Sequence, residues 1–221
     1  GLSARQVATS IGRPSPDALV SFKEKLGQFA VSHAERYRIS QVSRELVDGS
    51  GAKCVVAGMV ADSLLLRRVE PGDFKVLWEW ANDPLVRQSS FEVDSIPWEE
   101  HLEWCNRKIA DASCYFYLVG FQSGEPVGQV RFDIENQEAI VSIGLVSILR
   151  GRGLGLAVLL KATALFFENS NSKKIHAFIK PRNHASMRLF EAAGFSWLEE
   201  TQCKSQTAYH YILNKADHGQ V

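Results

Sequence analysis

Residues 149–162, LRGRGLGLAVLLKA, contain three glycines at alternate positions, two arginines between and before them, and an apolar stretch directly after. Glycine lets the backbone adopt conformations closed to other residues and lets a ligand approach the main chain. The apolar stretch is typical of a buried helix, and the N–H groups at a helix start attract anions. The stretch therefore predicts a strand, a glycine turn suited to a diphosphate, and a helix.

Two other phosphate sites based on glycine do not fit the turn. A P-loop requires GxxxxGK[ST], and neither Lys-Ser nor Lys-Thr follows these glycines. A dinucleotide site requires GxGxxG/A, but its third position falls on Leu156 or on Val158, depending on the starting glycine. What remains is Arg-x-x-Gly-x-Gly over 150–155, and a tight turn without a ligand is the alternative at this point.

The residues around the turn alternate between strand and helix patterns. Their order predicts β-α-α-β-β-β-α-β-α-β-β, which is an α/β (α+β) fold with helices packed on a mixed sheet. We expect strands at 64–69, 114–121, 127–134, 138–146, 173–180, 195–200 and 207–213, and helices at 71–83, 96–111, 154–168 and 183–194.

Composition excludes several classes of function. The 221 residues carry 25 basic and 25 acidic side chains, so no net charge attracts the chain to nucleic acid or to an anionic membrane. No apolar run approaches the roughly 20 residues that span a bilayer, and the first residues lack a secretory signal pattern. Four scattered cysteines show no metal-binding spacing. We expect a cytoplasmic protein without a metal, a nucleic-acid partner or a membrane partner.

The chain divides by pattern into four parts. Residues 1–16 mix polar residues, glycine and proline without a period and predict a flexible lead-in. Residues 17–62 have a helical pattern interrupted at DGSG. The main domain covers 63–215, and a short tail, 216–221, follows.

A second motif lies at 179–195, IKPRNHASMRLFEAAGF. Asn183 is suited to cap a helix that Gly194 ends. RGRGLG followed by N-x-x-S-x-x-L-F-E-x-x-G-F resembles the acyl-CoA site of the GNAT family of N-acetyltransferases, and the resemblance covers about residues 64–215. It implies the GNAT fold, with a mixed central sheet of about seven strands flanked by about four helices and preceded here by a small helical segment.

The resemblance also implies acetyl-CoA as co-substrate. The diphosphate would bind the glycine turn, and the pantetheine arm would pair with the preceding strand, whose N–H groups polarise the thioester carbonyl. The implied cofactor-binding residues are Ile143, Leu145, Val146, Arg150, Gly151, Arg152, Gly153, Leu154, Gly155, Asn183, Ser186 and Phe190.

The catalytic groups depart from the family pattern. Phe190 stands where many members have the tyrosine that protonates the leaving thiolate, so Ser186, ordered water or solvent is the substitute. Asp133 and Glu135 share one face of their strand and Glu138 begins the next strand, so each is a candidate base for the amine. Solvated, noncatalytic roles remain open for all three.

The acceptor side is predicted to be built from the first two helices and their loop, where tryptophan, asparagine and arginine are dense. Aromatic faces stack on sugar rings, while polar groups bind hydroxyls and phosphates. Core positions for the tryptophans are the alternative. The candidate substrate-binding residues are Trp80, Asn82, Arg87, Ser90, His101 and Arg131.

The stretch WANDPLVR (80–87) with the downstream I-x-x-EEH-x-x-W and VGQVRFD is similar to acetyltransferases of bacterial nonulosonic acid synthesis, which acetylate the 4-amino group of a UDP-linked deoxysugar. Residues 39–62 also resemble the closing helices of the nucleotide-sugar hydrolase of that route, which implies an upstream hydrolase domain. The alternatives are acetylation of protein N-termini or ribosomal proteins, and a noncatalytic acyl-CoA-binding module. We expect a monomer or homodimer.

Overall fold

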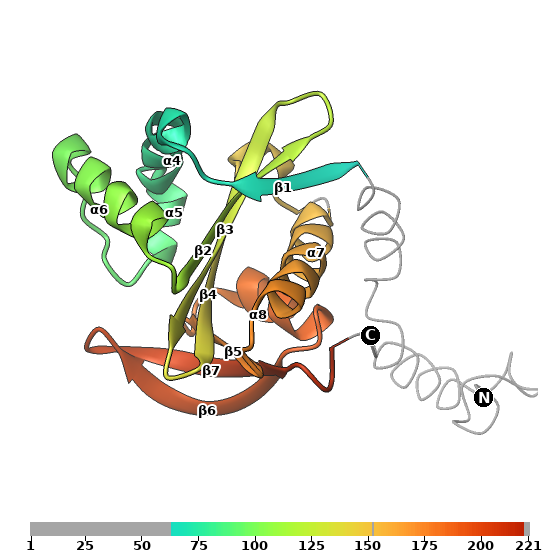
Figure 1. Ribbon diagram of the computed structural model, residues 1–221. Helices are drawn as coiled ribbons and strands as arrows, with labels where there is room; N and C mark the ends of the chain where they lie inside the picture. Colours follow the sequence, from blue (N-terminus) through green and yellow to red (C-terminus); the bar gives the residue numbers. More distant parts are fainter. Residues whose placement is uncertain (1–62, 152, 219–221) are drawn as a thin grey trace, which may run out of the picture. The chain divides into compact units, whose positions relative to one another are not determined.

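The computed structural model describes residues 63–151 and 153–218, which all lie within one compact unit of the chain (Figure 1). A seven-stranded sheet with the order β1-β2-β3-β4-β5-β7-β6 runs through it. Neighbouring strands are antiparallel, except that β4 and β5 are parallel. The predicted lead-in (1–16) and helical segment (17–62) lie outside the described residues.

The elements follow the order predicted from the sequence pattern. The strands are β1 (Leu64–Arg68), β2 (Cys114–Phe121), β3 (Pro126–Glu135), β4 (Glu138–Leu145), β5 (Lys174–Ile179), β6 (Ser196–Cys203) and β7 (Gln206–Asn214). The helices are α4 (Phe74–Ala81), α5 (Pro84–Ser89), α6 (Trp98–Ala110), α7 (Leu154–Asn169) and α8 (His184–Ala192). Single 3₁₀ turns precede α4 (Pro71–Asp73) and α7 (Ser147–Leu149). The fold is the predicted mixed α/β arrangement.

Helix α5 is the one difference in element count, because the sequence pattern predicted a loop there. The Asp83 side chain accepts hydrogen bonds from the Leu85 and Val86 N–H groups, and Pro84 occupies the first turn. An aspartate cap followed by proline is a local signal for a helix start. The described residues therefore contain five α-helices where about four were expected.

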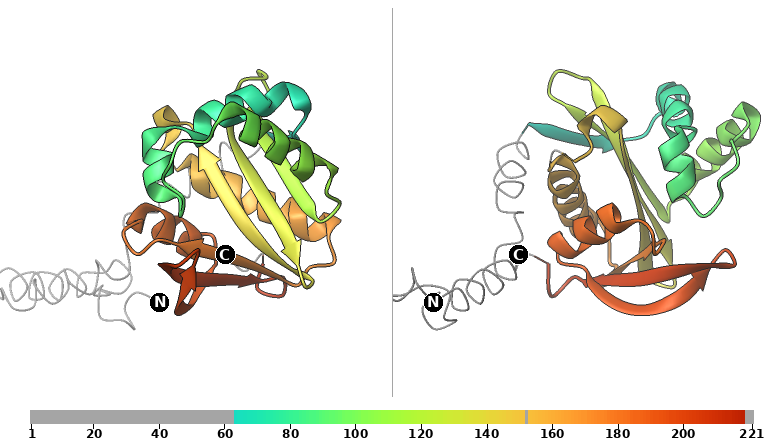
Figure 2. Two further views of the ribbon diagram at one scale, coloured as in Figure 1. Left: turned by 90° about the vertical axis from the view of Figure 1, so that its left-hand side faces the viewer. Right: turned by 180° about the vertical axis from the view of Figure 1, so that it is seen from behind.

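Helices cover both faces of the sheet. Figures 1 and 2 show α7 and α8 on one face and α4, α5 and α6 on the other. Alternate side chains of a strand enter different clusters: Tyr117 and Val119 pack in the α7 cluster, whereas Phe116 and Leu118 pack with α4 and α6. Phe166 of α7 is completely buried in the first cluster. No helix of the described residues is both long and apolar enough to span a bilayer.

Strands β4 and β5 part soon after they meet. Their pairing holds only Ala139 with Ile175 and Ile140 with His176, whereas β3 and β4 pair along the whole of β4. In Figure 1, β2, β3 and β4 run steeply while β6 and β7 cross the bottom of the view. The segment 141–145 thus has β3 on one side and no partner strand among the described residues on the other.

Candidate active site

The edge of β4 beyond its pairing with β5, which we call the open edge (141–145), presents main-chain groups. The Val146 N–H donates to the Val127 carbonyl of β3 at 3.0 Å. Because amide directions alternate along a strand, the N–H groups of Ile143 and Leu145 point away from β3, toward the side that β5 has left. An extended ligand arm can therefore hydrogen-bond to Ile143 and Leu145, two of the three strand residues predicted to bind it. The N–H group of the third, Val146, is already bonded to β3.

The start of α7 follows the open edge in the chain, and the first backbone N–H groups of the helix can donate hydrogen bonds to a ligand. Its first turn contains no acidic residue, and no side chain of the described residues caps it. Gly153 precedes the helix with φ +83°, and Gly151 has φ +75° with no atom within 4 Å of the position that a Cβ would take. This arrangement fits an anion held by main-chain donors. Arg152 lies outside the described residues.

Arg150 links this turn to the open edge and to the acceptor side. Its Nε donates to the Leu145 carbonyl at 2.9 Å, and its Nη1 lies 3.7 Å from the Asp83 carboxylate. The guanidinium is one-third exposed. A diphosphate at the turn would compete with Asp83 for this cation, because a doubly charged anion offers stronger pairing than a single carboxylate.

Helix α8 borders the turn through close packing. A Cβ on Gly155 would lie 3.4 Å from Leu189 of α8 and 3.5 Å from Leu145 of β4, which are ordinary packing distances, so these three elements meet at Gly155. The Asn183 side chain caps α8 by accepting from the Ser186 N–H at 3.1 Å, as its pattern predicted. Phe190, at the family tyrosine position, is buried with its ring edge against Phe195.

The predicted base Asp133 is held between two cations on the acceptor face of the sheet. Its carboxylate accepts from Lys108 Nζ and from Arg131 Nε, both at 2.7 Å. Burial opposes ionisation of Asp133, but the charge of Arg131 and the hydrogen bonds from both cations keep the pKa of this carboxyl below its usual range. Arg131 also stacks over the Trp104 ring at 4.7 Å. These contacts make Asp133 the centre of an ion-pair cluster.

The Asp133→Asn substitution is expected to lower the free energy of unfolding at pH 7 by about 2 kcal/mol, because two partly buried cations lose their counter-charge. The lowered pKa makes this stability present above the unfolded pKa, near pH 4, and lost as the pH falls through the folded pKa. Urea unfolding at pH 7 and pH 3 measures both effects. Glu135→Gln, on the exposed end of β3, is the control, and equal losses in the two variants would contradict the ion-pair role.

Glu138, the other predicted base, belongs to a chain of titratable groups across β4, β5, β7 and β6. Its carboxylate lies 2.6 Å from His176 Nε2 and 2.9 Å from Lys174 Nζ. His176 Nδ1 is 2.7 Å from His210 Nε2, and His210 Nδ1 is 3.6 Å from Glu199. Sequence reasoning did not single out the two histidines. Their signal was their position, each on the strand face opposite to the core residues.

Some of the residues predicted to bind the acceptor substrate make structural contacts within the protein, whereas others have groups that a ligand could contact. The Asn82 side chain accepts from the Ile96 N–H and donates to the Ile96 carbonyl, so it ties α4 to the loop before α6. His101 is buried, with Nε2 3.1 Å from the Phe74 carbonyl and its ring between Trp98 and Trp104. The Asn82 amide and the His101 Nε2 atom are thus engaged within the protein.

Arg87 is the available cation on the acceptor side. Its Nη2 donates to Ser90 Oγ at 3.2 Å and its Nη1 to the Asp94 carbonyl at 3.4 Å. Its buried Nε has no hydrogen-bond partner among the described residues. Burial lowers the pKa of Arg87, against the charge of Glu92. The structure therefore brings the predicted Arg87 and Ser90 together, whereas Trp80 packs at the edge of the α4–α6 cluster.

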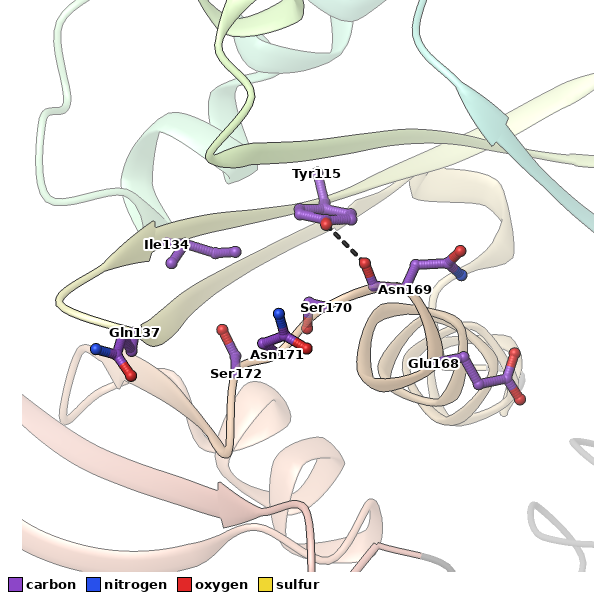
Figure 3. Close-up of a pocket in the computed structure, with 8 residues that line it drawn as sticks. All are labelled: Tyr115, Ile134, Gln137, Glu168, Asn169, Ser170, Asn171 and Ser172. Carbon is purple, nitrogen blue, oxygen red and sulfur yellow. Dashed lines mark hydrogen bonds between the residues drawn. The ribbon is translucent and has the colours of Figure 1, made fainter.

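A cavity of about 360 Å³ lies at the far end of α7 (Figure 3). It is lined by Tyr115, Ile134, Gln137, Glu168, Asn169, Ser170, Asn171 and Ser172. The 16 residues of α7 separate this cavity from the glycine turn by about 24 Å. It is therefore distinct from the glycine turn. No cluster of three or more metal-binding side chains occurs in 63–151 and 153–218.

Comparison with known families places this geometry in context. Residues 63–196 match the family model described as Acetyltransferase (GNAT) domain. An uncharacterized protein of Methanocaldococcus jannaschii is 27% identical over 158 residues, which are 68% of this chain and 31% of that protein. The chain thus spans about a third of the length of this curated relative.

Solved structures share the fold. An aminoglycoside acetyltransferase in complex with coenzyme A superposes with a TM-score of 0.63 at 18% identity, covering 72% of this chain and 99% of that one. Spermidine N-acetyltransferase from Vibrio cholerae, in complex with coenzyme A and spermine, superposes with a TM-score of 0.65 at 20% identity, covering 71% and 98%.

Proposed function

The chain belongs to the GNAT family of acyl-CoA-dependent N-acetyltransferases, and we propose that it transfers the acetyl group of acetyl-CoA to the amino group of a UDP-linked amino-deoxysugar. Acetyl transfer from acetyl-CoA is supported chiefly by the open edge of β4. This edge is followed in the chain by the start of α7, which no side chain of the described residues caps. Acetyl-CoA has an extended pantetheine arm with a diphosphate at one end, so it matches the open edge and the helix start together. Other observations support the proposal that the acceptor is a sugar.

The donor is proposed to lie along the turn and the open edge. The N–H groups of Gly153, Leu154 and Gly155 bind the diphosphate, Arg150 and Arg152 add charge, and Ile143 and Leu145 bind the arm. Acetyl-CoA supplies an activated acyl carbon, and main-chain donors beside it stabilise the charge that develops on its oxygen. The capped start of α8, Asn183 to Ser186, is the opposite wall.

The acceptor proposal is supported by Arg87 and by the sequence resemblance. Arg87 has a buried Nε without a partner among the described residues, which a phosphate oxygen would satisfy. The WANDPLVR stretch that contains it resembles nucleotide-amino-sugar acetyltransferases. The two solved relatives named above are acetyltransferases of an aminoglycoside and of spermidine, so they too act on amines of small molecules. The resemblance of residues 39–62 to the closing helices of a nucleotide-sugar hydrolase supports an upstream hydrolase domain as part of the same proposal.

A thiol-release assay tests the acceptor. We expect turnover to be fastest with UDP-linked 4-amino-4-deoxysugars, compared with an N-terminal peptide, spermidine and kanamycin. The Arg87→Gln substitution should raise the KM for the UDP-sugar about 10- to 100-fold, because one charge-assisted contact is lost, and leave the KM for acetyl-CoA unchanged. Arg107→Gln, on the exposed end of α6, is the matched control.

The other outcomes separate the alternatives. Preference for the peptide would contradict the sugar acceptor and favour protein acetylation. Acetyl-CoA binding, measured by calorimetry, without thiol release from any amine would favour a noncatalytic acyl-CoA-binding module.

A further inference from the structure

Four titratable side chains form a continuous chain, Glu138–His176–His210–Glu199, on the acceptor face of the sheet. Each comes from a different strand: β4, β5, β7 and β6 in turn. The rings of the two histidines are mostly buried, with 15% and 11% of their side chains exposed, whereas the two carboxylates are 43% and 60% exposed. Two buried imidazoles are thus held between two carboxylates that reach solvent.

With Glu138 ionised and both histidines neutral, the hydrogen bonds determine which nitrogens carry protons. Ionised Glu138 can only accept, so His176 must donate from Nε2. In neutral His176 the Nδ1 atom is then an acceptor, and it receives the Nε2–H of His210 at 2.7 Å. The remaining atom, His210 Nδ1, carries a lone pair and lies 3.6 Å from Glu199. The neutral chain therefore has one vacant proton position, at His210 Nδ1.

This position lies beside the parting of β4 and β5. His176 is the last residue of β5 that pairs with β4, and Phe178, two residues further along, is opposite His210 in the sheet. The Phe178 and His210 rings stack at 4.6 Å on the same face. On this face, Gln206 of β7 also donates to the Phe91 carbonyl of the loop after α5. His210 thus lies on the strand that the acceptor loop contacts.

We propose that His176 and His210 are the proton relay of the acetyl transfer, an inference that rests on the proposed function. The ammonium group of the acceptor gives one proton to His210 Nδ1, directly or through water. His210 passes its Nε2 proton to His176 Nδ1, and His176 passes its own Nε2 proton to Glu138, which releases it to solvent. The neutral amine then attacks the acyl carbon.

The acetyl transfer itself forms one bond and breaks one bond at the acyl carbon. The amine nitrogen forms a bond to the acyl carbon while the bond from this carbon to sulfur breaks, and the electron pair leaves with the thiolate. The second proton of the nitrogen ends on the sulfur. Only one proton, the one that made the amine an ammonium ion, crosses the relay.

The charges around the relay determine its pH dependence. Burial lowers the pKa of His210, and the adjacent His176 lowers it further, against the carboxylate of Glu199. Hydrogen bonds from Lys174 and His176 keep the pKa of Glu138 low. His210 accepts a proton from the substrate only when its own ring is neutral. We therefore expect kcat to fall as the pH drops through an apparent pKa below the usual histidine value.

Variants of the relay test this inference in the thiol-release assay, with the best amine of the panel. His210→Asn should lower kcat about 100-fold and remove the acidic limb of the kcat–pH profile. His176→Asn should have the same effect. Glu199→Gln, a positioning change, should shift the limb to lower pH, because His210 loses the charge that favours its protonated form. Glu200→Gln, next along β6, is the control.

Acetyl-CoA affinity, measured by calorimetry, separates the possible failures. Retained affinity together with an unchanged kcat and an unchanged pH limb in His210→Asn overturns the relay alone. A wild-type chain that binds acetyl-CoA and acetylates no amine of the panel contradicts the proposed function and the relay with it. Loss of acetyl-CoA binding in His210→Asn also overturns the relay, since it would assign His210 to donor binding.

Discussion

Replacing Gly153 by valine is expected to weaken acetyl-CoA binding about 1000-fold, the sum of backbone strain and lost hydrogen bonds to a charged group. Gly153 has φ +83°, a conformation that a β-branched residue adopts only at high cost. In the proposed donor arrangement, the valine side chain would also stand between the diphosphate and the first N–H groups of α7. Calorimetric titration with acetyl-CoA measures the change.

Gly124→Val is the matched control for this prediction. Gly124 has φ +89° in the turn between β2 and β3, with open space around it, so the substitution imposes the same strain away from the turn that starts α7. We expect this variant to lose stability and to keep its affinity for acetyl-CoA. If Gly153→Val bound acetyl-CoA as tightly as the wild type, the proposed position of the diphosphate would be refuted. If Gly153→Val and Gly124→Val lost the same affinity for acetyl-CoA, backbone strain alone would explain the loss.

Local signals in the sequence were sufficient to predict most of the fold. The glycine turn, the Asn183 cap and Gly194 delimit α7 and α8 because each acts within one helical turn of its own position. Short apolar or alternating runs separated by turn residues predicted all seven strands for the same reason. Helix α5 was missed because its six residues are too few for a periodic pattern, although Asp83 and Pro84 mark its start.

The roles of the site residues were harder to predict from the sequence, because they depend on contacts with residues that are distant in the chain. Asp133 was a candidate base by residue type, but Lys108, 25 residues earlier in the chain, binds its carboxylate. His101 was a candidate ligand contact, and the packing of α6 on α4 buries it. Strand alternation could place each histidine on the face opposite to the core, but the contact between them joins β5 to β7 across 34 residues, so no local pattern could reveal the pair.

Gly128 of β3 pairs with Leu145, on the side of β4 opposite to the open edge. A Cβ on Gly128 would lie 2.5 Å from the Gly144 carbonyl oxygen and 2.6 Å from the Leu145 side chain. A main-chain oxygen cannot rotate away as a side chain can, so the strands must separate. Gly128 is therefore required for the close β3–β4 contact that holds Leu145 in place.

The Gly128→Ala substitution is expected to lower the free energy of unfolding by about 3 kcal/mol, as overpacking against a backbone does, measured by urea denaturation. Gly144→Ala is the control in the same strand pair, because its Cβ would meet only the Gln129 side chain, at 3.5 Å. This second variant should keep its stability. Because the Leu145 main chain forms part of the open edge, Gly128→Ala should also weaken acetyl-CoA binding under conditions in which it remains folded. Similar stabilities for the two variants would contradict the close approach of β3 and β4.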